Sequence, residues 1–93
     1  DLGASVFNPL HSIAKLRLAR IYMEESNAGE VLNLLEDEQN LTSSLFEVKG
    51  DAERSLGNIS EAKLSYLQAL ELSNSQPIRS LISMKISDLQ EDR

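Results

Sequence analysis

The segment from Phe46 to Leu72 constrains the fold more than any other, because it predicts two antiparallel helices with closely spaced backbones. Gly50 interrupts an otherwise helical pattern, in which a glycine costs about 1 kcal/mol relative to alanine. We expect Ala62 and Ala69 on the next helix to supply the packing reason for this glycine. Gly57-Asn58 separates the two helices, with the glycine ending the first and the asparagine capping the second. The segment therefore predicts a tight helical hairpin.

Apolar residues at helical spacing predict three more helices around this hairpin. The first runs from Leu10 to about Glu25 and begins at Asn8-Pro9, a typical cap and first position. Another spans about 27–37, and a closing helix spans about 77–90. We expect residues 1–8 to be an irregular lead and residues 9–93 to form one domain.

The spacing Asn-x-x-Glu, which is typical of a capping box, begins at Asn27 and again 31 residues later at Asn58. The same offset relates Ala19 to Gly50. A two-helix unit with a period of this size is typical of tetratricopeptide repeats. We therefore expect an all-α, tetratricopeptide-like array of about five antiparallel helices in a short right-handed superhelix. Its parts are a degenerate repeat at about 10–40, a repeat at about 41–75 and the closing helix.

Composition excludes several functions. The net charge of −6 argues against nucleic acid and against anionic membrane surfaces, because both require a basic patch. The chain has no cysteine, so it has neither disulfides nor thiolate metal sites. It has no run of about 18 apolar residues, so we expect no membrane contact within it. The sequence begins at Asp1 and shows neither an initiating methionine nor a signal peptide, so we expect the chain to be part of a longer protein.

Catalytic residues are hard to find. His11 is the one histidine, and the absence of cysteine removes the usual nucleophile–base pairs. Glu36-Asp37-Glu38 is the densest acidic cluster, but adjacent helical side chains point about 100° apart and do not converge on one ion. We therefore expect no enzyme activity, no cofactor and no metal. The enzymatic alternative would use this cluster as a metal-assisted hydrolase site.

Acidic residues also dominate a longer stretch, since the residues between Ile21 and Val48 include seven acids and no Lys or Arg. Two interpretations remain open. The stretch is either a solvated face that keeps the protein soluble or an acidic patch that meets a basic partner.

The repeat register predicts a binding groove, because the first helix of each pair lines the concave face of such an array. This face is polar and of mixed charge, and it suits an extended peptide or a flexible segment of a partner protein. The alternative is that its charges pair with one another, for instance Asp51 with Arg54. The closing helix would add Lys85 and Asp88. The predicted groove residues are Arg20, Met23, Glu24, Glu47, Asp51, Arg54 and Ser55.

The first helix is apolar on more than one side, which predicts that other parts of the protein cover it on two sides. A preceding helix of a longer protein is one candidate cover. Without it, we expect either a homodimer through this helix or a cover formed by Leu2–Phe7.

Two short motifs flank the repeat and carry a family resemblance. Leu16-Arg17-Leu18-Ala19-Arg20 and the closing Met84-Lys85-Ile86…Leu89, in this order around one full repeat, resemble the C-terminal half of YfgM-like proteins. These proteins are ancillary subunits of the bacterial SecYEG translocon. The resemblance covers roughly residues 11–90.

The resemblance implies a membrane-anchored protein with a tetratricopeptide-like domain on the periplasmic side of the inner membrane. It also implies two protein partners, the SecYEG translocon and the chaperone PpiD. The expected function is non-enzymatic interaction within this secretion and chaperone network. The alternative is a generic tetratricopeptide adaptor or scaffold in another compartment.

Overall fold

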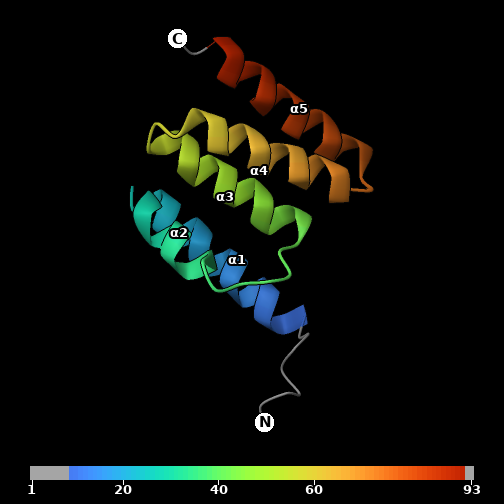
Figure 1. Ribbon diagram of the computed structural model, residues 1–93. Helices are drawn as coiled ribbons and strands as arrows, with labels where there is room; N and C mark the ends of the chain where they lie inside the picture. Colours follow the sequence, from blue (N-terminus) through green and yellow to red (C-terminus); the bar gives the residue numbers. More distant parts are fainter. Residues whose placement is uncertain (1–8, 92–93) are drawn as a thin grey trace.

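A computed structural model describes residues 9–91 of the chain (Figure 1). These residues form five α-helices and no strand. The prediction of an all-α array is confirmed, whereas the irregular lead predicted at 1–8 lies outside the described residues. The helices are α1 (Pro9–Glu24), α2 (Ala28–Leu35), α3 (Ser43–Ser55), α4 (Ile59–Leu72) and α5 (Gln76–Glu91).

The helices stack in chain order along one axis. α1 packs against α2 and α3, α3 packs against α2 and α4, and α4 packs against α5. Figure 1 shows α1 and α2 at one end of the stack and α5 at the other, with the α3–α4 pair between them. The molecule is accordingly elongated, with extents of 47 × 29 × 19 Å. The α1–α2 pair and α5 are therefore the two ends of the stack.

Two apolar clusters hold the stack together, and α3 contributes to both. Leu45, Val48 and Ala52 on one side of α3 pack with buried residues of α1 and α2. Phe46, on another side of α3, packs against the cluster that α4 and α5 form around Tyr66. Because burial of apolar surface is the main driving force of folding, α3 is the element that joins the two hairpins.

Gly50 lies at a close helix contact, as predicted, and its nearest neighbour is Tyr66 rather than Ala62 or Ala69. A Cβ atom at this position would lie 2.6 and 2.7 Å from two ring carbons of Tyr66. Ala62 and Ala69 are fully buried on the same helix, one turn before and one turn after that ring. The aromatic ring therefore requires the glycine.

The turns after α1 and α3 are alike, which supports the 31-residue repeat. The amide of Asn27 donates to the carbonyl of Tyr22, and the amide of Asn58 donates to the carbonyl of Glu53, both at 2.8 Å. Backbone hydrogen bonds between residues five positions apart are typical of the Schellman motif, which needs one residue in the left-handed helical conformation. Gly57 supplies it with a φ of 86°, and Ser26 takes the equivalent place with a φ of 60°.

The capping boxes predicted at Asn27 and Asn58 are wrong in one respect, because neither side chain makes a cap hydrogen bond. Their backbone angles, with ψ of 54° and 73°, lie outside the extended region that a capping side chain requires. Thr42 does cap a helix, since its hydroxyl accepts from the amide of Leu45 at 3.2 Å.

Two helix ends lie about two residues from the predicted positions. α3 begins at Ser43, slightly after the predicted start of the second repeat at about 41, because Thr42 is its cap. α2 ends at Leu35 instead of about Asp37, before the acidic cluster that the negative end of a helix dipole disfavours.

Candidate functional site: a polar groove on the first helix of each layer

An open groove of about 650 Å³ runs across α1, α3 and α5. All seven residues predicted from the repeat register line it, and Lys85 joins them from α5. The spacing that places them there is helical, since each of these helices presents one polar stripe to the same side of the stack. The lining residues are Arg20, Met23, Glu24, Ser44, Glu47, Val48, Asp51, Arg54, Ser55 and Lys85.

Three residues depart from the prediction. Asp88, three positions after Lys85 on α5, is exposed and does not line the groove. Ser44 and Val48 line the groove but were not predicted. Ser44 lies at i−3 and i−7 from Glu47 and Asp51, so the helical period of the predicted residues could have found it.

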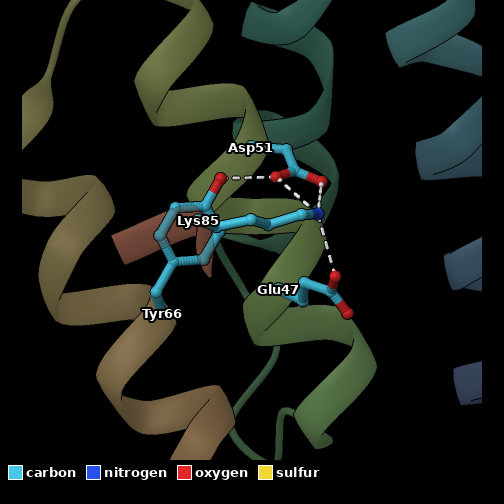
Figure 2. Close-up of polar contacts among 4 residues, drawn as sticks. All are labelled: Glu47, Asp51, Tyr66 and Lys85. Carbon is cyan, nitrogen blue, oxygen red and sulfur yellow. Dashed lines mark hydrogen bonds and ion pairs between the residues drawn. The ribbon is translucent and has the colours of Figure 1, made fainter. Parts of the chain in front are cut away.

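Four side chains from three helices converge at one wall of the groove (Figure 2). Lys85 Nζ donates to Glu47 Oε2 at 2.8 Å and to the two carboxylate oxygens of Asp51 at 3.1 and 3.2 Å. The hydroxyl of Tyr66 also donates to Asp51. This cluster, which we call the Lys85 cluster (Glu47, Asp51, Tyr66 and Lys85), ties α5 to both helices of the preceding pair.

Charge and burial act in opposite directions on Lys85. Burial alone would lower the pKa of its ammonium group, but the hydrogen bond to Glu47 and the charge and hydrogen bond of Asp51 raise the pKa above its ordinary value. The ammonium also lies 5.9 Å from the centre of the Tyr66 ring, within the range of a cation–π contact. Lys85 is therefore a fixed cation at neutral pH.

Tyr66 is fully buried, and its hydroxyl is held in the protonated form. Burial raises the pKa of this phenol well above its ordinary value, and the hydrogen bond to Asp51 and the carboxylate charge raise it further. The hydroxyl therefore acts as a donor to Asp51.

This shift predicts a loss of stability in alkali. A phenol whose pKa is raised by folding contributes its full stability below its unfolded pKa of about 10 and loses it progressively above that pH. From pH 9 to pH 11 we expect the free energy of unfolding to fall by about 1.4 kcal/mol through Tyr66. Urea unfolding across this range measures the fall.

Tyr66→Phe is the comparison for this prediction, because it removes the titrating group and keeps the ring. The variant is less stable at pH 7, since Asp51 loses a hydrogen bond, but its stability should fall about 1.4 kcal/mol less between pH 9 and pH 11. Equal losses in the two proteins would contradict the assignment.

The remaining groove charges have no partner within residues 9–91. Arg20, Arg54 and Glu24 are exposed, and none forms an ion pair with another described residue. The suggested pairing of Asp51 with Arg54 is wrong, because Lys85 and Tyr66 engage Asp51 instead. Two arginines and one glutamate are thus available to a ligand.

A second polar network behind the groove explains two departures from the repeat pattern. The tetratricopeptide pattern prefers a leucine directly before the glycine at position 50 and an aromatic residue three positions after it, where this chain has Lys49 and Glu53. These two side chains bond to each other at 3.0 Å. Glu53 is buried, and the hydroxyl of Ser65 on α4 donates to its other oxygen at 2.6 Å. The two polar residues compensate each other within the α3–α4 interface.

The acidic stretch does not form a metal centre in the part of the chain that the structure describes. Glu38 instead bonds to Lys15 at 2.9 Å and lies 3.3 Å from the His11 ring, so the segment after α2 is held against α1. The hydrogen bond from Lys15 lowers the pKa of Glu38 despite its partial burial. Among the described helices, none has the length and apolar content to cross a membrane.

Stacked helix pairs with a polar groove along their first helices define a helical-repeat protein-interaction domain. Residues 4–91 match the family model of the tetratricopeptide repeat-like domain, and the chain belongs to this family. It is similar to the ancillary SecYEG translocon subunit of Buchnera aphidicola subsp. Acyrthosiphon pisum (strain APS), with 27% identity over 84 residues.

The aligned region covers 88% of this chain but 44% of that relative, so the chain spans less than half of the relative's length. No solved structure matches the chain. The resemblance to YfgM-like translocon subunits, predicted from the two flanking motifs, is confirmed.

Proposed function

We propose that this chain is a non-enzymatic adaptor domain that binds extended segments of Sec translocon proteins in the groove across α1, α3 and α5. The proposal is carried by one observation: the seven residues that the repeat register predicted line a single open groove. Arg20, Arg54 and Glu24 supply charged groups without partners among the described residues, and backbone or side-chain groups of an extended peptide would pair with them.

The translocon enters the proposal through the similar protein, whose name assigns it to SecYEG. The same resemblance suggests the periplasmic side of the inner membrane as the place of action and the chaperone PpiD as a second partner. Two helix pairs and a closing helix make a shallow groove, so we expect affinity in the micromolar range and fast exchange, as in transient adaptors.

Site-specific crosslinking in living bacteria tests the proposal. A photo-reactive amino acid placed at Ser55 in the groove should crosslink to a translocon subunit or to PpiD. The matched control places it at Leu64, which is 64% exposed on α4 and outside the groove. Adding Arg54→Glu should reduce the Ser55 product about tenfold by reversing one groove charge.

Equal crosslinking from Ser55 and Leu64 would contradict the groove. Crosslinks from Ser55 to proteins outside the secretion system would support the groove but reject the translocon assignment. The two parts of the proposal are therefore tested separately.

A further inference from the structure

α5 carries two exposed apolar side chains on the side that bears Lys85. Ile78 is 39% exposed and Leu81 is 43% exposed. Leu81 precedes Lys85 by one helical turn and Ile78 precedes it by two, so the three side chains share one side of the helix. Lys85 lines the groove, and the other two lie beyond its lining residues, toward the start of α5. We call Ile78 and Leu81 the α5 apolar pair.

The repeat relates α5 to α3 by an offset of 34 residues, which is the separation of Asp51 and Lys85. Both of these residues line the groove. The same offset relates Val48 to Ile82, and both are buried against the helices that precede them in the stack, Val48 with α1 and α2 and Ile82 with α4. α5 therefore presents to the groove the same side that α3 presents.

This offset assigns the α5 apolar pair to groove positions. It relates Ile78 to Ser44 and Leu81 to Glu47, and these two residues of α3 line the groove. The polar stripe of α3 thus continues on α5 as an apolar surface. A ligand that crosses from α3 to α5 would meet charged and hydroxyl groups first and aliphatic side chains afterwards.

Stacking of a further helix after α5 does not account for the pair. The side of α3 that packs against α4 includes Phe46 and Gly50. The 34-residue offset relates them to Ser80 and Met84, which are exposed on α5. A helix stacked after α5 in the manner of this array would pack on the side of Ser80 and Met84, and the α5 apolar pair would still face the groove.

We propose that the segment bound in the groove is bipartite, with charged or polar residues over α1 and α3 and an apolar residue packed on Ile78 and Leu81. This inference rests on the proposed function and names the chemistry of its ligand. Burial of an aliphatic side chain against the pair would add hydrophobic affinity to a groove that otherwise offers charges and hydroxyls. The pair would also reject segments that are polar throughout.

Crosslinking from α5 tests the inference with the full-length protein in living bacteria. A photo-reactive amino acid at Leu81 should crosslink to the same partner protein as one at Ser55. Mass spectrometry should locate both crosslinks within about ten residues of each other in one segment of the partner, because an extended chain covers about 3.3 Å per residue. The crosslink from Leu81 should lie next to an apolar residue.

Met84 provides the matched control, because it is apolar and 63% exposed on a different side of the same helix. A photo-reactive amino acid at this position should give about tenfold less of the partner product than one at Leu81.

A synthetic peptide of the mapped segment then measures what the apolar contact contributes. Fluorescence anisotropy with the full-length protein should show about tenfold weaker binding when the apolar residue of the peptide is replaced by serine, and a similar loss for Leu81→Ser. The two changes together should cost little more than either alone, because each removes the same contact. Met84→Ser should leave the affinity unchanged. Circular dichroism should show intact helices in both variants, since both side chains are exposed.

The results separate this inference from the proposed function. If Ser55 crosslinks to a partner and Leu81 does not, the groove of the proposed function stands and the bipartite ligand is wrong. If neither position crosslinks to a partner, both are wrong. A crosslink from Leu81 to a second copy of this chain, or equal effects of Leu81→Ser and Met84→Ser on peptide affinity, would also overturn the inference.

Discussion

Gly50→Ala is expected to destabilise the protein by about 2 kcal/mol, and Gly50→Leu by about 3 kcal/mol. Alanine is the better helix former by about 1 kcal/mol, so helix propensity alone predicts the opposite sign. The added Cβ atom would lie 2.6 Å from a ring carbon of Tyr66. That ring has no free space to move into, because it is fully buried and its hydroxyl is bonded to Asp51. Urea unfolding followed by circular dichroism measures the difference.

Gly29→Ala is the matched control, since Gly29 is also helical but a Cβ atom there meets nothing within 4 Å. We expect it to stabilise the protein by about 0.5–1 kcal/mol through helix propensity and a less disordered unfolded chain. A double-mutant cycle then tests the contact itself. Gly50→Ala should cost about 1 kcal/mol less in a Tyr66→Leu background, where the ring is gone. If Gly50→Ala stabilises the protein as much as Gly29→Ala, the close contact with Tyr66 does not exist.

The sequence predicted the array well because helical periodicity and small residues are local signals. A glycine within an apolar helical pattern indicates a close contact wherever its partner lies. The nearest partner, Tyr66, could not be predicted. Ala62, Tyr66 and Ala69 all pack into the same cluster, and a local pattern does not say which of them lies nearest to Gly50. The contact at this glycine is a tertiary property, because it depends on how α3 and α4 pack, and the hydroxyl of the same tyrosine bonds to Asp51 on α3.

The groove residues could be predicted for a similar reason. A repeat fixes which positions of each first helix face the concave side, so seven of the lining residues follow from register alone. Their pairing could not be predicted in this way. Asp51 and Arg54 are neighbours on one helix, but Lys85 lies 34 residues after Asp51 and makes two hydrogen bonds to it. Contacts between distant segments depend on how α5 docks, which no local pattern encodes.

The caps show the same division between local and tertiary effects. Asn-x-x-Glu predicted where α2 and α4 begin, and both helices do begin directly after their asparagine. The side-chain hydrogen bond is missing because each asparagine follows a left-handed residue in a Schellman turn. The turn forms its own backbone hydrogen bond between residues five positions apart. The helix therefore begins where it was predicted to begin, although the predicted capping hydrogen bond is not formed.

Lys85→Met is expected to lower the free energy of unfolding by about 2 kcal/mol at pH 7. The substitution keeps the length and apolar contacts of the side chain but removes the cation between two carboxylates. Glu47 and Asp51 have side chains 14% and 31% exposed, so water solvates them incompletely when the cation is gone. The cost is below that of a fully buried pair because all three groups keep some contact with solvent.

The pH dependence gives this prediction a second test. Because folding raises the pKa of Lys85, its contribution is fully present below the unfolded pKa of about 10.4 and is lost as the pH rises through the folded value. The difference between the wild type and Lys85→Met should therefore stay constant from pH 7 to pH 9 and shrink above pH 10.

Lys63→Met is the matched control, because Lys63 is exposed on α4 and forms no ion pair with a residue in 9–91. It should change stability by less than about 0.5 kcal/mol. Glu47→Gln should be less costly in the Lys85→Met background than in the wild type, since the glutamate has then lost its partner. If Lys85→Met costs no more than Lys63→Met, then α5 is held without the Lys85 cluster, by its apolar residues Ile82, Ile86 and Leu89 and by the hydrogen bonds from Arg79 to the carbonyls of Leu70 and Ser73. The Lys85 cluster would then orient groove charges without stabilising the array.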